Sequence, residues 1–171
     1  VDTGETVRVY RGLYSRPTGS WWGVDSDRFM CIEEHGFLHV WRPDEQTWPK
    51  VFRASEGEIQ RAQFVGGGEH VAVVTALETV EVIDWRSGEL LAQHQWSDAE
   101  AEVSYVDSSR VVAVGQGARG ERVLEWDIEL KLERAVAGVG PLVVDVLAYG
   151  EGDSRFLLTT AEGDLEAWDF T

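Results

Sequence analysis

The stretch that decides the fold lies near the end of the chain and runs Leu165-Glu166-Ala167-Trp168-Asp169. Three other segments align with it without gaps: Leu38-His39-Val40-Trp41, Val80-Glu81-Val82-Ile83 and Val123-Leu124-Glu125-Trp126. The large apolar residue that ends each segment stands at positions 41, 83, 126 and 168, and an Asp follows three of the four. This nearly constant spacing predicts an internal repeat of roughly 42 residues.

Each copy of the repeat reads as four short strands. An apolar stretch and a turn of Gly and polar residues precede each anchor segment, another strand and turn lie before them, and a fourth strand follows. The apolar stretches are 29–32, 71–75, 111–115 and 156–159, and the fourth strands fall in 46–53, 90–96 and 129–136. β-Branched and aromatic residues at period two, bounded by turns, are typical of strands. Because no long stretch shows helical spacing, we expect an all-β unit.

The repeat resembles the WD repeat, whose units of about 40 to 45 residues form the four-stranded blades of a β-propeller. The Trp-Asp of that family is matched by Trp126-Asp127 and Trp168-Asp169, conservatively by Ile83-Asp84, and half by Trp41-Arg42. Ser87-Gly88-Glu89-Leu90-Leu91 is similar to the family's outer strand. The resemblance implies one propeller domain or half-propeller over residues 1–171, with four WD-repeat-like blades from units 3–42, 43–84, 85–127 and 128–171.

Two expectations about packing follow from the repeat. The anchors Trp41, Ile83, Trp126 and Trp168 should be equivalent and mostly buried between blades. Glu125 stands in an otherwise apolar row, so its carboxylate needs a partner or must lean to solvent. The family's Gly-His dipeptide is missing from all four units, so its buried hydrogen-bond network is not expected in the usual form.

The N-terminal stretch Thr3-Gly4-Glu5-Thr6-Val7-Arg8-Val9-Tyr10 looks like an outer strand, and the fourth unit ends without one. In the related family the N-terminal strand completes the last blade, so we predict the same closure here, within the chain or by swapping between chains. Three assemblies remain open: a closed four-blade ring, two chains that share an eight-blade ring as a homodimer, and a fragment whose remaining blades lie in a longer parent chain.

The composition is strongly acidic, with 31 Asp and Glu against 15 Lys and Arg and a net charge of −16. Such a field repels phosphate backbones and anionic headgroups, which argues against nucleic acid and membrane surfaces as partners. The charge serves either solubility or the attraction of a basic protein. Cys31 is the single cysteine, which excludes an internal disulfide and favours a reducing compartment. We therefore predict a cytoplasmic protein.

Catalytic patterns are absent from the sequence. The four histidines are scattered over different parts of the repeat, and no nucleophile elbow, phosphate-binding loop or calcium loop is present. We predict no catalytic residues, no cofactor and no metal. The favoured function is a non-enzymatic protein–protein interaction scaffold of WD-repeat type. The alternatives are a hydrolase or lyase built on a propeller frame, and purely structural blades of a larger ring.

The resemblance also implies where a protein or peptide partner binds. In the related family, loops that lead into the inner strand and loops between the second and third strands line one rim. Here that rim would comprise Arg11, Tyr14, Arg16, Trp21, Glu34, His35, Glu56, Trp96, Asp98, Arg119 and Glu162. Tyr, Trp and Arg are frequent at interface hot spots. For Trp21 and Trp22 we also weigh the alternative that at least one packs in the core between blades.

Overall fold

The computed structural model describes residues 9, 11–23, 28–42, 48–96, 102–105, 110–114, 121–127, 132–137, 143–148 and 155–169. Within these residues the strands form four antiparallel sheets, which we call blades 1 to 4. Blade 1 consists of β1 (Pro17–Trp22), β2 (Phe29–Glu33), β3 (Leu38–Trp41) and β4 (Lys50–Phe52). Blade 2 consists of β5 (Ile59–Val65), β6 (His70–Thr75), β7 (Thr79–Asp84) and β8 (Leu90–Gln95). Blade 3 consists of β9 (Glu102–Tyr105), β10 (Arg110–Val114), β11 (Glu121–Asp127) and β12 (Leu132–Ala137). Blade 4 consists of β13 (Val143–Ala148), β14 (Arg155–Thr160) and β15 (Leu165–Asp169).

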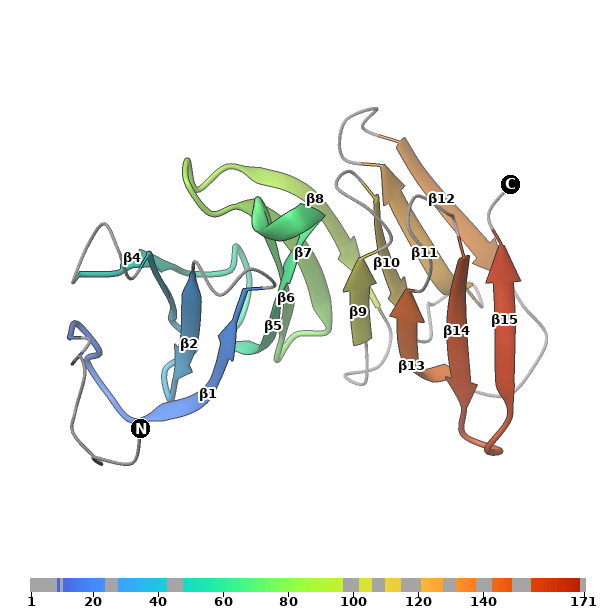
Figure 1. Cartoon of the computed structure of the whole chain (residues 1–171), viewed down its shortest axis with the longest axis horizontal. Helices are drawn as coiled ribbons and strands as arrows, with labels where there is room; N and C mark the ends of the chain where they lie inside the picture. The colour runs from blue at the N-terminus through green and yellow to red at the C-terminus, as the bar shows by residue number, and fades with distance from the viewer. Residues whose placement is uncertain are drawn as a thin grey trace, which may run out of the picture.

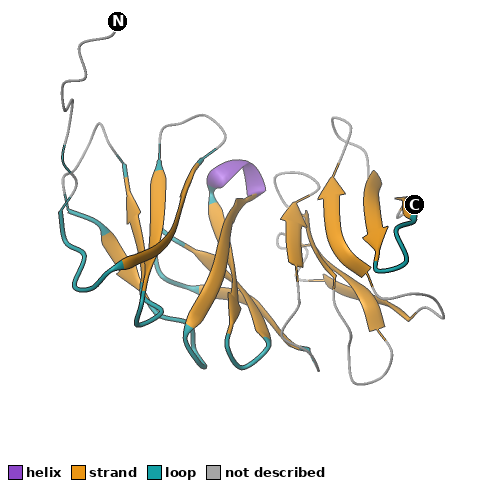
Figure 2. Ribbon diagram, turned by 90° about the horizontal axis from the view of Figure 1, so that it is seen from below, coloured by secondary structure: helices purple, strands orange, loops and turns teal. Residues whose placement is uncertain are grey.

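The strands of each blade pair in chain order, and the blades stand side by side with blades 1 and 4 at opposite ends of the molecule (Figure 1). Blades 2, 3 and 4 contact each other through their first strands, β5 with β9 and β9 with β13, and blades 1 and 2 contact each other through β2 and β5. The single helical turn of the described residues is η1 (Gly66–Gly68), which joins β5 to β6 (Figure 2). No helix of the described chain is long and apolar enough to cross a membrane. The predicted all-β architecture of successive blades is confirmed: blades 1 to 3 have four strands each, and the described residues of blade 4 form three.

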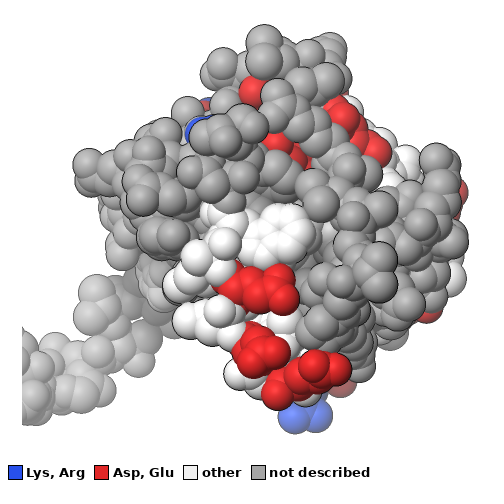
Figure 3. All heavy atoms as spheres, turned by 90° about the vertical axis from the view of Figure 1, so that its right-hand side faces the viewer, with Lys and Arg blue, Asp and Glu red and all other residues white. Residues whose placement is uncertain are grey.

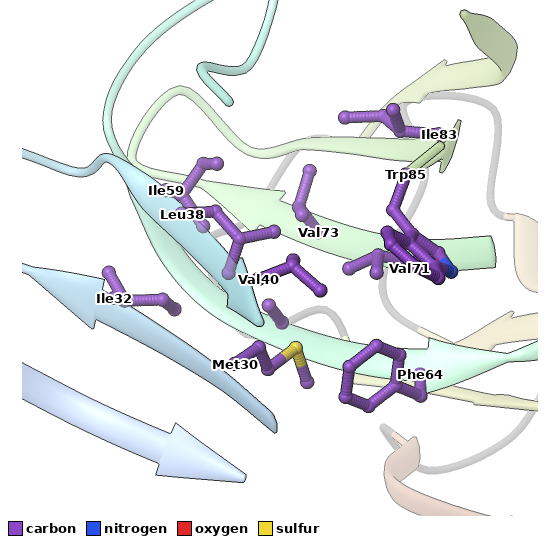
Figure 4. Close-up of a cluster of buried hydrophobic side chains, with 11 residues drawn as sticks. Met30, Ile32, Leu38, Val40, Ile59, Phe64, Val71, Val73, Ile83 and Trp85 are labelled. Carbon is purple, nitrogen blue, oxygen red and sulfur yellow. The ribbon is translucent and has the colours of Figure 1, made fainter. Parts of the chain in front are cut away.

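The core lies between the blades, because alternate residues of each strand face opposite neighbours. Figure 4 shows the first junction, where side chains of β2 and β3 meet side chains of β5, β6 and β7. Met30, Leu38 and Val40 of blade 1 pack there against Phe64 and other apolar residues of blade 2. A second cluster, which includes Val82 and Trp126, joins blades 2 and 3, and a third joins blades 3 and 4.

The four anchor residues occupy equivalent places, as predicted. Each lies on the third strand of its blade. The second-strand residues with which the four anchors pair also occupy equivalent positions. Ile83 faces blade 1, Trp126 faces blade 2, and Trp168 packs against the junction with blade 3. Trp41, Ile83 and Trp126 are buried, and Trp168 is half-buried. The repeat assignment is therefore confirmed at its deciding positions.

Glu125 finds the partner that its position requires. Its side chain is buried in blade 3, on the face of β11 opposite to Trp126. The guanidinium of Arg110, on the neighbouring strand β10, lies 3.9 Å from the Glu125 carboxylate. The apolar row therefore accommodates a carboxylate because a cation from the same sheet accompanies it.

Closure by the N-terminal strand is not decided by the described residues. Residues 3–8 and 10 lie outside them, so their pairing with the last blade stays a prediction. At the other end of the described chain, β15 is the last strand of a three-stranded sheet, whereas the third strands of blades 1, 2 and 3 each pair with a fourth. Within the described residues, the outer edge of blade 4 therefore carries no further strand.

Candidate functional site

Two sets of loops meet at one rim of the blades. Loops of the first set lead into a blade, and in blades 1 and 2 these are 11–16 and 53–58. Loops of the second set join the second and third strands of a blade, and in blades 1 and 2 these are 34–37 and 76–78. Backbone hydrogen bonds connect the sets. The Glu34 N–H donates to the Arg16 carbonyl at 2.9 Å, and the Ala76 N–H donates to the Glu58 carbonyl at 2.8 Å. We call the surface formed by these four loops the upper rim.

A buried carboxylate fixes the first of these loops. The N–H groups of Tyr14 and Ser15 donate to one oxygen of Glu33, at 2.8 and 3.0 Å. Glu33 ends β2, and its side chain is buried beneath the loop. The Nε2 atom of His39 lies 3.5 Å from the same carboxylate oxygen. The loop is thus held to the sheet through its backbone, and the Tyr14 side chain takes no part in these hydrogen bonds.

The protonation states of this buried pair are set by opposing causes. Burial would raise the pKa of Glu33, but the amides of Tyr14 and Ser15 and the neighbouring His39 outweigh it, and the pKa lies below its ordinary value. Burial lowers the pKa of His39, and the nearby Glu33 only partly opposes this. At neutral pH the pair is therefore a carboxylate beside a neutral imidazole. A carboxylate is the form that accepts two amide hydrogen bonds.

A second buried carboxylate holds the loop that enters blade 2. The N–H of Ser55 donates to both oxygens of Glu81, at 3.0 and 3.1 Å, and the Ser55 hydroxyl donates to the same group. The Gln93 side-chain amide donates to the Ser55 hydroxyl oxygen at 3.1 Å. Glu81 belongs to β7 and is buried. Blades 1 and 2 therefore position their incoming loops with carboxylates, in place of the hydrogen-bond network that the sequence lacks.

Three apolar or aromatic side chains stand exposed on the rim loops: Leu13, Tyr14 and Leu77. Tyr14 is 78% exposed, although its own N–H is bound to a buried group. Leu77, in the turn between β6 and β7, is also exposed and lies beside Gly57 of the loop entering blade 2. The Arg53 guanidinium stands 4.0 Å above the centre of the Phe37 ring. The upper rim therefore presents apolar, aromatic and cationic groups from loops that touch one another.

The structure brings several of the predicted partner-binding residues to this rim. Tyr14, Arg16, Glu34, His35 and Glu56 are exposed on three of its four loops. Glu162 is exposed on the corresponding turn of blade 4, and Arg11 is exposed at the start of the loop before β1. Asp98 and Arg119 lie outside the described residues.

The prediction for Trp96 is wrong. Its side chain is 2% exposed and packs in the junction of blades 2 and 3 with Trp126 and Val82. Its backbone N–H donates to the Glu78 carbonyl at 2.9 Å, which holds the start of the loop close to the sheet with the indole inside. Trp96 therefore stabilises the core and presents no surface to a partner.

Trp21 and Trp22 also differ from expectation. Both lie on β1 and both are exposed, so the interpretation of at least one as core is wrong. Trp22 faces away from blade 2, where the described chain has no further blade to cover it. The Trp21 ring lies over Gly19, where a β-carbon would clash with it. Neither residue is part of the upper rim.

The rim residues that sequence reasoning missed are Leu77, Phe37 and Arg53. The stretch 77–79 reads as a polar turn because Glu and Thr follow the leucine, yet a leucine in a tight turn has few ways to reach the core. A leucine in a polar turn was therefore the signal by which Leu77 could have been found in the sequence. Phe37 and Arg53 are separated in sequence, and only the folded sheet places one over the other.

The turn that carries Leu77 holds a strained residue. Glu78 has φ of 64°, and it stands where the equivalent turn of blade 1 has Gly36, with φ of 67°. A side chain in this left-handed region costs roughly 1 kcal/mol or more, because the β-carbon crowds the backbone. Positive φ at a non-glycine residue is typical of binding sites and other places where the surroundings impose it.

Replacing this residue by glycine should stabilise the protein. We expect Glu78→Gly to raise the free energy of unfolding by about 0.5 kcal/mol, the relief of strain less the added freedom of the unfolded chain. Urea unfolding followed by tryptophan fluorescence measures it. In contrast, Gly36→Ala should destabilise, because its β-carbon would lie 2.6 Å from Glu58 Cβ as well as at positive φ. Equal losses from both changes would contradict the assignment of strain.

The described histidines serve different local roles. His39 is buried beside Glu33, His35 is exposed in the turn before it, and His94 lies 3.7 Å from a Glu133 oxygen. Burial lowers the pKa of His70, against the opposing effect of Asp84. Among the described residues, no group of three or more His, Cys, Asp and Glu side chains is placed to hold a metal ion.

Successive antiparallel blades, packed face to face around their first strands, define the β-propeller class of fold. No protein-family model matches the sequence, and no curated protein sequence matches it either. The structure is similar to the crystal structure of the C-terminal WD40 domain of Sif2, with a TM-score of 0.73 and 16% sequence identity. The match covers 94% of this chain and 46% of that chain, so the chain spans less than half the length of that domain. The fold is therefore WD40-like.

Proposed function

We propose that this chain is a non-enzymatic protein-interaction scaffold that binds a protein or peptide partner through the upper rim. The observation that carries the proposal is the exposure of Tyr14, on a loop that the buried Glu33 holds, and of Leu77, on a turn whose N–H donates to the Thr75 hydroxyl oxygen. Exposed apolar side chains on rigid loops bind at low entropic cost, because little freedom remains to be lost on association. Tyrosine is also among the side chains that contribute most at interfaces.

The charge of the rim indicates the chemistry of the partner. Glu34, Glu56 and Glu58 are exposed on its loops, and the whole chain carries a net charge of −16. Arg11, Arg16 and Arg53 are the cations on these loops. A partner segment with basic side chains around an apolar anchor suits this pattern, since the overall field would steer it to the surface.

The WD40-like fold supports the same function, because folds of this kind generally serve as scaffolds for protein partners. The fold alone does not determine what a rim binds, because binding depends on the side chains that the particular chain presents there. We expect the scaffold to act in the cytoplasm, where a single buried thiol such as Cys31 stays reduced.

Selection from a random-peptide phage library tests the proposal. We expect the purified chain to enrich peptides that carry an apolar residue flanked by Lys or Arg. Tyr14→Ala and Leu77→Ala should each weaken binding of a synthetic copy of such a peptide by about tenfold or more, which isothermal titration calorimetry measures.

The matched control is Leu90→Ala. Leu90 is exposed, as the rim residues are, but it begins β8 beside the connection 85–89, at the opposite end of the strands. Its replacement should leave the affinity unchanged. Peptides that lose affinity with Leu90→Ala and keep it with both rim variants would refute the upper rim as the binding site.

A further inference from the structure

The outer side of blade 1 exposes apolar side chains next to cations. Trp48 is 65% exposed, and Leu13 and Val51 are exposed as well. Arg11 and Arg53 are also exposed, each two residues along the chain from one of these apolar residues. We call these five residues the side patch. Exposed apolar side chains that stand together are typical of interaction sites.

A contact between two segments brings the side patch together. A β-carbon on Gly12 would lie 2.7 Å from Pro49 Cδ and 3.3 Å from Trp48 Cε3. Gly12 also has a φ of 107°, a left-handed value that suits glycine. The segment that carries Arg11 and Leu13 therefore lies directly against the segment that carries the exposed indole.

The other members of the side patch lie on the same side of the sheet. Val51 pairs with His39, and cross-strand partners of an antiparallel pair share a face. The Arg53 guanidinium stands 4.0 Å above the centre of the Phe37 ring, and Phe37 precedes His39 by two residues on that face. The Tyr14 ring lies 6.0 Å from the His39 ring, which brings its loop to this face as well.

The side patch is built over a filled part of the blade. Cys31, His39 and Trp41 lie on the same face of the sheet, and each is at most 3% exposed. The buried Glu33 holds the backbone of the loop by accepting the Tyr14 N–H. Apolar groups presented by a fixed backbone lose little freedom when a partner binds them.

The charge near the side patch differs from that of the chain as a whole. Residues 11–16 and 48–53 together contain four Lys and Arg and no Asp or Glu. Residues 1–53 hold seven of the 15 Lys and Arg and eight of the 31 Asp and Glu, so the net charge is −1 there and −15 over residues 54–171. Blade 4 lies at the opposite end of the molecule (Figure 1), and acidic side chains gather there (Figure 3).

We propose that the side patch binds an acidic segment of another protein, in which Asp or Glu flanks an apolar anchor. The anchor packs on Trp48 and its apolar neighbours, and the flanking carboxylates meet the guanidinium groups of Arg11 and Arg53. Trp and Arg are among the side chains that contribute most at interfaces. The partner is opposite in charge to the basic peptide proposed for the upper rim, so this proposal does not rest on that one.

The charge distribution favours a short acidic segment over a nucleic acid. A nucleic acid carries a charge at every phosphate, so the acidic blades beyond residue 53 would repel it along its length. A short segment carries few charges and stays at blade 1. Salt screens charges farther away than roughly 8 Å at physiological ionic strength, whereas the contacts at the side patch are closer than that.

Panning a peptide library in which every member carries an apolar anchor flanked by Asp or Glu tests the proposal. We expect the full chain to enrich members of this library, and fluorescence anisotropy of a labelled copy to show saturable binding. Trp48→Ala should weaken that binding by about tenfold or more, and Arg53→Gln by about threefold to fivefold. Both positions are exposed, so neither change should unfold the chain, which circular dichroism checks.

Leu77→Ala and Arg61→Gln are the comparison variants, because they remove an exposed leucine and an exposed arginine of blade 2, outside the side patch. Each should bind the acidic peptide as the parent chain does. Trp48→Ala should in turn keep the affinity of the upper rim for a basic peptide, so failure of one proposal is distinguishable from failure of the other.

Failure of the full chain to enrich any acidic peptide would overturn the proposal. The same conclusion would follow if Trp48→Ala and Arg53→Gln bound the acidic peptide as tightly as the parent chain. Tighter binding of a single-stranded oligodeoxythymidylate than of the acidic peptide, lost in both variants, would make the side patch a nucleic-acid site instead.

Discussion

Trp126→Ala should lower the free energy of unfolding by about 3 to 5 kcal/mol, the range for truncating a large buried aromatic residue. Trp126 fills the junction of blades 2 and 3 among Val82, Trp96 and Leu124. Its indole N–H also donates to Glu133 at 2.9 Å, a hydrogen bond that alanine removes. Urea unfolding monitored by circular dichroism gives the difference directly.

The control for this change is Trp48→Ala. Trp48 is exposed and outside the three buried clusters, so its loss should change stability by no more than about 0.5 kcal/mol. Similar effects from the two tryptophans would mean that the anchors do not hold the blades together.

Glu33→Ala should destabilise the protein by roughly 3 kcal/mol. The change leaves the buried N–H groups of Tyr14 and Ser15 without their acceptor and opens space beside His39. Glu33→Gln should have about half this effect, because its amide oxygen still accepts hydrogen bonds. Urea unfolding measures both, and hydrogen exchange should show faster exchange of the Tyr14 and Ser15 amides in the alanine variant.

The neighbouring Glu34 supplies the comparison, since it is exposed and carries the same charge. Glu34→Ala should alter stability by less than about 0.5 kcal/mol. If Glu33→Ala were equally mild, the loop would be held by something other than the buried carboxylate.

The sequence contained enough to predict the architecture. Trp41, Ile83, Trp126 and Trp168 recur at one spacing, and the structure places all four on third strands in the same register. The pattern is visible in the sequence because every blade uses the same position of its third strand for packing. The carboxylate of Glu125 was likewise predictable as needing a partner, since burial of an unpaired charge is unfavourable.

The site was less predictable, because it depends on side-chain directions in loops. Trp96 follows a strand directly, and its indole packs in the core while its backbone N–H donates to the Glu78 carbonyl. Glu33 and Glu81 look like ordinary acidic residues of strands until their loop partners are known, because those partners lie 18 to 26 residues away in sequence. Trp22 was interpreted as a core residue, as its counterpart Phe64 in blade 2 is, but Trp22 is 55% exposed.

Chemical-shift mapping by NMR tests the central claim, that the upper rim of a WD40-like row of blades binds the partner. A peptide chosen by library selection would be titrated into isotope-labelled chain. The account predicts that the perturbed amides cluster in residues 11–16, 34–37, 53–58 and 76–78, which form the upper rim. Perturbations confined to 66–69 and 85–89, the connections at the other ends of the strands, would contradict it.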